Sequence, residues 1–147
     1  FGLENGDVHR FTAEAIVDTT VRFMKRESLE RVAKTDPAIV RSILSMTTDN
    51  LQHAENHLLL LGRKTSVERV AAFLVEMDHH RLTSAGVMAL PMNRRDIADY
   101  LGVTLETVSR ALTVLKNKGF LKFLGLTQRE IVVLNSAGLA ELAESEM

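Results

Sequence analysis

One long segment without a helix-breaking residue constrains this chain more than any other feature. From Ala38 to Leu61 the sequence contains neither glycine nor proline, and its apolar residues recur at alternating intervals of four and three. Such heptad spacing is typical of a helix that packs along a single seam against another helix. The seam positions, of which only the threonine is polar, are Val40, Leu44, Thr47, Leu51, Ala54, Leu58 and Leu61.

Two kinds of partner could cover this seam. The helix could pack on a large domain of its own chain, or it could meet the same helix of a second copy. Only small domains are expected on either side of it, so the sequence favours a homodimeric coiled coil. We therefore interpret residues 37–63 as a dimerisation helix.

The residues before this helix predict part of a sheet. Phe11–Val17 and Thr20–Met24 are rich in strand-forming residues, and a short helix is expected over Ser28–Ala33 with Ser28 as its N-cap. Two short strands bury too little surface to form a core alone. Because the sequence also begins without methionine, we expect residues 1–36 to be the end of a larger sheet domain.

Composition and motif content argue against several classes of protein. The sequence has no cysteine and a formal net charge of −1. It has no apolar run long enough to span a membrane and no signal-peptide pattern. No glycine-rich phosphate loop, nucleophile elbow or paired-carboxylate cleft is evident. We therefore expect a cytoplasmic protein that is not an enzyme, does not contact membranes and carries no cofactor.

Two histidines one helical turn apart raise the question of a metal site. His53 and His57 have this spacing, but alanine follows the first histidine where the zinc-protease pattern requires glutamate. No third ligand is evident, so we expect a solvated helix face and no metal.

Two short helices are predicted between Asn93 and Gly119. Asn93, with Asp96 three residues later, and Thr104 are typical N-caps. Gly102 suits the turn between the helices, and Gly119 suits the left-handed position that ends the second one. A pair of helices joined by a short glycine-containing turn is typical of a helix-turn-helix.

The flanking segments extend this pair to a winged helix-turn-helix. Thr65–Glu68 has the spacing of a capping box, which starts the helix before the pair. Phe120–Phe123 and Ile131–Leu134 are strand-like and would form the hairpin of the wing. The predicted fold class is therefore α+β, with residues 64–147 as a winged helix-turn-helix DNA-binding domain.

The second helix of the pair has two different sides. Its predicted apolar side consists of Leu105, Val108, Ala111, Leu112 and Leu115. The opposite side carries Glu106, Ser109 and Arg110, which we predict to contact bases, because arginine can donate twice to guanine and glutamate can accept from cytosine. The candidates for contact with the DNA backbone are Arg94, Arg95, Thr104, Thr107, Thr113 and Lys116.

A less specific interpretation of this polar side also exists. Glu106 and Arg110 are four residues apart, so they could form an ordinary ion pair on a solvated helix surface. The cations near them, Arg94, Arg95, Lys116, Lys118 and Lys122, outnumber Asp96 and Asp99. Such a local excess favours phosphate binding.

The segment from Met92 to Thr113, MNRRDIADYLGVTLETVSRALT, resembles the DNA-binding motif of the CRP/FNR family. The resemblance extends over essentially the whole chain. It implies a β-roll sensor domain, of which residues 1–36 would be the end, followed by a dimerisation helix and a winged helix. It also implies two partners, double-stranded DNA and a second copy of the chain.

Within that family, Glu106, Ser109 and Arg110 resemble the FNR type, which recognises TTGAT half-sites in an inverted repeat such as TTGAT-N4-ATCAA. The N-terminal run and the motif are most similar to FixK proteins, which control microaerobic and nitrogen-fixation genes. This resemblance implies a transcription activator. It also makes Leu82–Ala89 a candidate surface for RNA polymerase.

Two other functions remain open at this point. Thr47 and Thr48 suggest an effector-gated, CRP-like regulator. Their hydroxyls resemble those that contact cyclic AMP on the dimerisation helix of CRP. The winged helix could instead serve as a protein-interaction module that contacts no bases. The first predicts DNA binding that depends on added ligand, and the second predicts no sequence preference.

Overall fold

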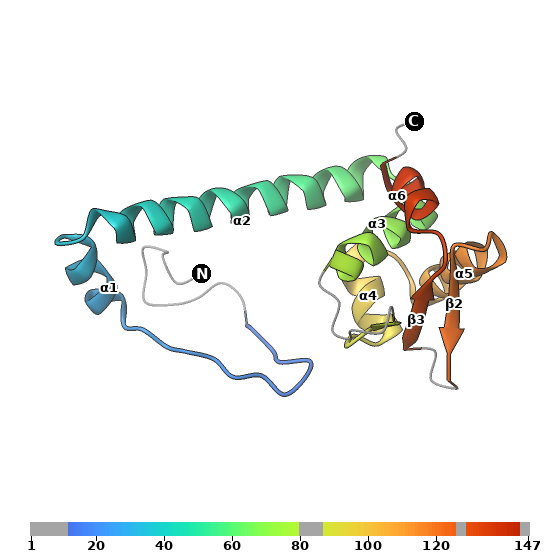
Figure 1. Ribbon diagram of the computed structural model, residues 1–147, viewed down its shortest axis with the longest axis horizontal. Coiled ribbons are helices and arrows are strands. Elements are labelled where there is room, and N and C mark those ends of the chain that lie inside the picture. The colour runs from blue at the N-terminus through green and yellow to red at the C-terminus, as the bar shows by residue number, and fades with distance from the viewer. Residues whose placement is uncertain (1–11, 80–86, 126–128, 145–147) are drawn as a thin grey trace. The chain divides into compact units, whose positions relative to one another are not determined.

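The computed structural model describes residues 12–79, 87–125 and 129–144 (Figure 1). Its helices are α1 Arg26–Ala33, α2 Pro37–Arg63, α3 Ser66–His79, α4 Arg94–Leu101, α5 Leu105–Asn117 and α6 Ser136–Glu144. Its strands are β1 Val87–Ala89, β2 Leu121–Leu124 and β3 Glu130–Val133. Contacts divide the chain into two compact units, of which the first ends at Glu55 and the second begins at Asn56, inside α2.

The predicted long helix is confirmed as α2. It starts at Pro37, where proline is well suited because the first helical N–H needs no partner within the helix. The side chain of Asp36 accepts a hydrogen bond of 2.9 Å from the Ala38 N–H and so serves one of the free N–H groups of the first turn. No residue of α2 is buried within this single chain.

The two predicted strands before α1 are wrong for the described residues. Residues 12–25 contain no strand and pair with no other described segment. A strand requires a neighbouring strand that pairs with its N–H and C=O groups. The strand preference of individual residues does not provide such a neighbour. Ser28 is not the N-cap either, because α1 begins at Arg26. Within the helix, the Nε of Arg26 donates a hydrogen bond to Glu30 at 2.8 Å.

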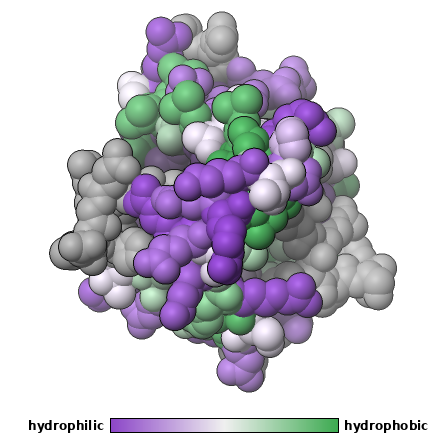
Figure 2. Space-filling view, turned by 90° about the vertical axis from the view of Figure 1, so that its left-hand side faces the viewer, coloured by the Kyte–Doolittle hydropathy of each residue, from purple (hydrophilic) through white to green (hydrophobic). Residues whose placement is uncertain are grey.

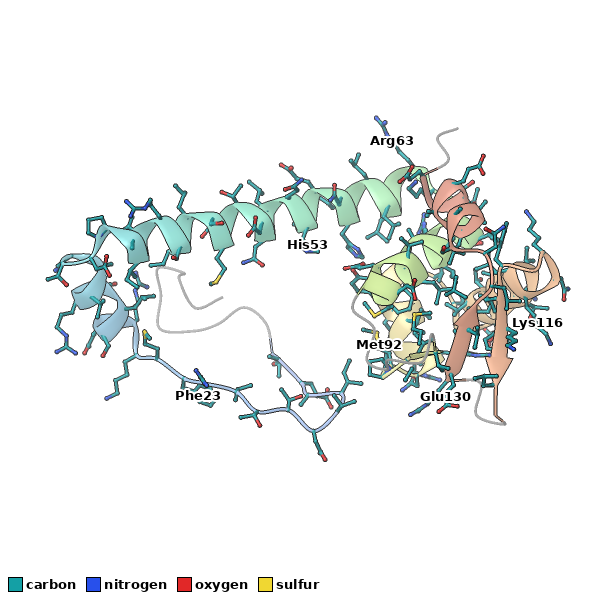
Figure 3. All side chains as sticks on the ribbon, in the orientation of Figure 1. Phe23, His53, Arg63, Met92, Lys116 and Glu130 are labelled. Carbon is teal, nitrogen blue, oxygen red and sulfur yellow. The ribbon has the colours of Figure 1, made fainter. Side chains whose placement is uncertain are left out.

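Apolar side chains of the first unit reach its surface. Phe23 is 92% exposed and stands out from the backbone in Figure 3. Hydrophobic and hydrophilic residues both lie on the surface in the view of Figure 2. Neither α1 nor any part of α2 contains a buried residue.

The second unit includes α3, α4, α5, α6 and the three strands (Figure 1). All of them contribute side chains to one hydrophobic core. The predicted capping box is confirmed at the start of α3, where the Thr65 N–H donates to Glu68 at 2.8 Å and Thr65 Oγ1 accepts from the Glu68 N–H at 3.4 Å. The largest fully buried side chains are Phe73, Leu74, Met88, Ile97, Leu101, Leu115, Leu121, Ile131, Leu139, Val70 and Val108.

The sheet of this unit has three antiparallel strands in the order β1-β3-β2. The hairpin of β2 and β3 confirms the predicted wing. The strand β1 was not predicted, although its Met88 pairs with Ile131 and is buried. Val87–Ala89 is thus a strand and not part of a loop, and the rest of the candidate surface for RNA polymerase, residues 82–86, lies outside the described residues.

The final helix α6 closes the core. Its Leu139 and Ala143 are buried, and a Cβ atom on Gly138 would lie 2.8 Å from the ring of Phe120. Only glycine therefore fits at this point without a shift of its neighbours. The Lys64 ammonium donates to the Ala143 carbonyl, which connects α6 to the segment between α2 and α3.

Candidate nucleic-acid interface

The first helix of the motif, α4, is fixed at both ends by its own sequence. Asn93 Oδ1 accepts from the Arg95 N–H at 2.8 Å and the Asp96 N–H at 3.1 Å. Asp96 in turn accepts from the Asn93 N–H at 2.9 Å, which completes the predicted capping box. The helix ends at Gly102, whose φ of 61° lies in the left-handed region that favours glycine.

The second helix, α5, begins one short turn later. Thr104 is its N-cap, as predicted, and accepts from the Thr107 N–H at 3.2 Å. The Val103 N–H donates to Ala98 in α4 at 3.0 Å, which fixes the turn between the two helices. The helix ends before Gly119, whose φ of 76° matches the predicted left-handed position.

The two predicted sides of α5 are largely confirmed. Val108, Ala111, Leu112 and Leu115 are buried, and Glu106, Arg110 and Thr113 are exposed. One assignment was wrong, since Leu105 is 38% exposed and does not belong to the core. It is the first residue of α5, so only part of its surface reaches neighbouring side chains. An apolar side chain therefore lies on the surface beside Glu106.

The Glu106 carboxylate is held at the N-terminal end of α5. Its own backbone N–H and the Thr104 hydroxyl donate to it, and the charges of Arg110 and Arg95 act in the same direction, so the pKa of Glu106 is lowered. A negative charge in the first turn is also favoured by the helix dipole. Within the described residues, Glu106 and Arg110 form no ion pair within 4 Å.

Replacement of Thr104 by valine is expected to raise the pKa of Glu106. Because the folded pKa is lowered, the ionised carboxylate stabilises the fold above its ordinary pKa, and this stabilisation is lost as the pH falls through the lowered value. Loss of the N-cap should also destabilise α5 by about 1 kcal/mol. NMR titration of the Glu106 carboxyl measures the first effect. Thr104→Ser, which keeps the hydroxyl, is the control, and an unchanged pKa in Thr104→Val would contradict the assignment.

Ser109, a predicted base-contacting residue, accepts hydrogen bonds from two other side chains. The Arg94 Nη1 donates to its hydroxyl oxygen at 3.1 Å, and the Arg94 guanidinium lies 5.8 Å from the centroid of the Phe123 ring in β2. The Thr113 hydroxyl donates to the Ser109 carbonyl at 2.8 Å. Arg94 thus connects α4, the polar side of α5 and the wing.

The remaining residues predicted to contact the DNA backbone lie on α4, on α5 and at the N-cap of α5. Arg95 is exposed in the first turn of α4, and Lys116 is exposed in the last turn of α5 (Figure 3). Thr107 is half-buried and shares a hydrogen bond of 3.0 Å with the Thr104 hydroxyl. The structure therefore places cations and hydroxyls on α4 and α5 around Glu106 and Arg110.

One cation of the interface region was missed at the sequence level. Arg129, which directly precedes the wing strand β3, lines a pocket together with Asn93 and Arg94. It is exposed. Its position two residues before the predicted strand Ile131–Leu134 was the available signal.

The predicted seam of α2 is open to solvent in the single chain. Val40, Leu44, Leu51 and Leu58 are between 49% and 69% exposed. The hydroxyl of Thr47, the polar member of the seam, donates to the Ile43 carbonyl at 2.8 Å. Leu61 differs from the others, because it is half-buried in the second unit.

Comparison with known proteins defines the family. A model described as the Crp-like helix-turn-helix domain matches residues 68–142. The chain belongs to the CRP/FNR family of transcription regulators. This confirms the resemblance and the predicted long helix followed by a helix-turn-helix. The family is one of transcription regulators and not of enzymes.

The relatives include FixK proteins. The nitrogen fixation regulation protein FixK of Azorhizobium caulinodans is 42% identical over 81% of this chain and 50% of its own length. The protein of the same name from Rhizobium meliloti is 41% identical over 82% and 54%. The solved structure of FixK2 from Bradyrhizobium japonicum aligns with a TM-score of 0.77 and 53% identity, over 84% of this chain and 61% of that one.

The chain spans about half the length of these FixK relatives. What it shares with them is the long helix and the helix-turn-helix that follows it. In the described part of the chain, no helix is both long enough and apolar enough to cross a bilayer.

Proposed function

We propose that this protein is a homodimeric, cytoplasmic transcription activator that binds an inverted repeat like TTGAT-N4-ATCAA. The observation that carries the proposal is the exposed surface of α5. Glu106 and Arg110 project from a helix whose opposite side is anchored in the core, and the helix-turn-helix is of the Crp-like type. The surface is therefore both fixed in place and free to enter a major groove.

Each base-contacting residue has a proposed partner in the half-site. Arg110 donates two hydrogen bonds to the guanine, and Glu106 accepts from the cytosine paired with it or from a neighbouring base. Ser109 lies against an adjacent thymine. The lowered pKa of Glu106 keeps its carboxylate ionised and able to accept.

The proposed dimer is supported by α2 and by the symmetry of the proposed DNA site. An inverted repeat has two half-sites whose centres lie one helical turn, about 34 Å, apart, so two copies of α5 must be presented together. The exposed apolar seam of α2 is the surface that would join the copies. In this proposal residues 37–63 are the dimerisation helix and residues 64–147 the DNA-binding domain.

Target genes and polymerase contact are proposed from the relatives. Three of them are named nitrogen fixation regulation protein FixK, and one from Stutzerimonas stutzeri is named transcriptional activator protein FnrA. We infer that this protein controls microaerobic or nitrogen-fixation genes. An activator acts through contact with RNA polymerase, which is therefore its proposed protein partner.

Replacement of Arg110 by alanine tests the base contact. The variant is expected to bind the inverted repeat about 1–3 kcal/mol more weakly and to lose discrimination at the G·C pair of the half-site. Fluorescence anisotropy with duplexes changed at one base pair measures both effects.

Lys116→Ala is the matched control on the same helix. A phosphate contact should weaken binding to all duplexes equally and reduce the slope of affinity against salt by about one unit. If Arg110→Ala behaves in this way, or binds as tightly as the parent, Arg110 does not contact a base.

A further inference from the structure

One arginine joins three separate segments of the second unit. Arg69, in the first turns of α3, donates from Nη2 to the Leu61 carbonyl at 2.7 Å and from Nη1 to the Leu101 carbonyl at 3.1 Å. Its Nε donates to the Lys64 carbonyl at 3.0 Å. All three guanidinium nitrogens of this half-buried side chain are thus used on backbone oxygens.

The three acceptors explain why an arginine occupies this position. Leu61 lies in the last turn of α2 and Leu101 is the last residue of α4, so both carbonyls belong to helix ends where the helix itself offers no donor. Such ends also carry partial negative charge. A planar guanidinium is always charged and directs several donors at fixed angles. A lysine ammonium cannot serve three separated oxygens in the same way.

Side-chain packing reinforces the same connection between the end of α2 and the helices α3 and α4. The ring centroids of His57 in α2 and Tyr100 in α4 lie 4.5 Å apart. The ring centroids of Tyr100 and Phe73 in α3 lie 5.9 Å apart. Burial, together with the charge and hydrogen bond of Glu76, raises the pKa of Tyr100, so its hydroxyl stays neutral. The end of α2 is therefore attached to the helix-turn-helix by the Arg69 hydrogen bonds and by this aromatic contact.

We propose that Arg69 is a positioning residue that sets which half-site spacing the dimer accepts. This inference rests on the proposed function, because it requires two copies of α5 on one inverted repeat. One added base pair moves a half-site by about 3.4 Å and turns it by about 34° around the DNA axis. A dimer whose DNA-binding domains are fixed to α2 cannot follow that turn without strain. A dimer in which the connection between α2 and the DNA-binding domain is loosened can follow the rotation of the half-site.

Affinity for four duplexes tests the proposal. They are a single TTGAT half-site and inverted repeats with spacers of three, four and five base pairs. The parent is expected to prefer one spacer by about tenfold or more, because a mismatched spacing forfeits simultaneous binding of both half-sites. Arg69→Ala should keep half-site affinity within about twofold while its spacer preference falls to about threefold or less.

Two further variants separate geometry from charge. Arg69→Lys keeps the positive charge but not the fork of donors, so it is expected to lose spacer preference as well. Arg63→Ala removes a positive charge from the last residue of α2, where the side chain is exposed and points away from the helix (Figure 3). This control is expected to keep the spacer preference of the parent. Should Arg69→Ala be unfolded at the assay temperature, Arg69→Lys carries the same comparison.

Each contrary outcome has a defined meaning. Unchanged spacer preference in both Arg69 variants overturns the proposal, as does an equal loss of affinity for the half-site and for all repeats. A parent that prefers no spacer overturns it too. A parent that binds none of the duplexes contradicts the proposed function itself.

Discussion

A chain that carries both Leu51→Glu and Leu58→Glu is expected to be monomeric and to bind the inverted repeat about 10²- to 10⁴-fold more weakly than the parent. The two leucines are one heptad apart on α2 and are 59% and 69% exposed in the single chain. In a homodimer each glutamate would face the apolar seam of the partner helix, and burial of an unpaired carboxylate is costly. Loss of the dimer removes the gain from binding two half-sites at once.

Sedimentation velocity and DNA affinity should be measured on the same samples. Gln52→Glu with Asn56→Glu is the matched control, because it adds the same two charges to α2 at exposed positions off the seam. This control is expected to remain dimeric. A double leucine variant that stays dimeric would show that the seam does not hold the copies together. A single half-site duplex, which needs only one copy, should bind both variants equally.

Features set by neighbouring residues could be predicted from the sequence. The caps at Asn93, Thr104 and Thr65 depend on side chains that bond to N–H groups two or three residues away. The left-handed φ of Gly102 and Gly119 depends on the absence of a Cβ atom. The heptad of α2 and the two sides of α5 follow from helical periodicity, because it is fixed by backbone geometry.

Features that need a distant partner could not be predicted in this way. The strand β1 exists because Met88 pairs with Ile131, and nothing in three residues specifies that register. The strands predicted within residues 11–24 had suitable residue types, but the described part of the chain offers them no neighbour. Residue preference for strands is a weak signal without a known pairing.

The candidate interface shows the same division. The positions of Glu106 and Arg110 follow from the period of α5. The contact of Arg94 with Ser109 and Phe123 depends on how α4 and the wing lie against α5. The contacts of Arg69 could not be predicted from the sequence, because the Leu101 carbonyl is 32 residues away and meets Arg69 only in the folded unit.

Replacement of Leu115 by alanine is expected to destabilise the hydrophobic core against which α5 packs. Leu115 is fully buried, with 0% of its surface exposed, among side chains of the core. Removal of a buried leucine costs about 2–5 kcal/mol, from lost burial and from the cavity left behind. A domain of this size should then melt at least about 10 °C lower, because each kcal/mol shifts its Tm by about 4–8 °C.

Val114→Ala is the matched control one residue earlier in α5. Val114 is 37% exposed, so its truncation removes less buried surface and leaves no enclosed cavity. It should lower the Tm by only a few degrees, at about 1 kcal/mol or less. Thermal unfolding followed by circular dichroism compares the two variants. Equal shifts would mean that α5 is not anchored through Leu115. DNA affinity below the Tm should stay near that of the parent for Leu115→Ala, since Leu115 is buried and does not lie on the side of α5 that carries Glu106 and Arg110.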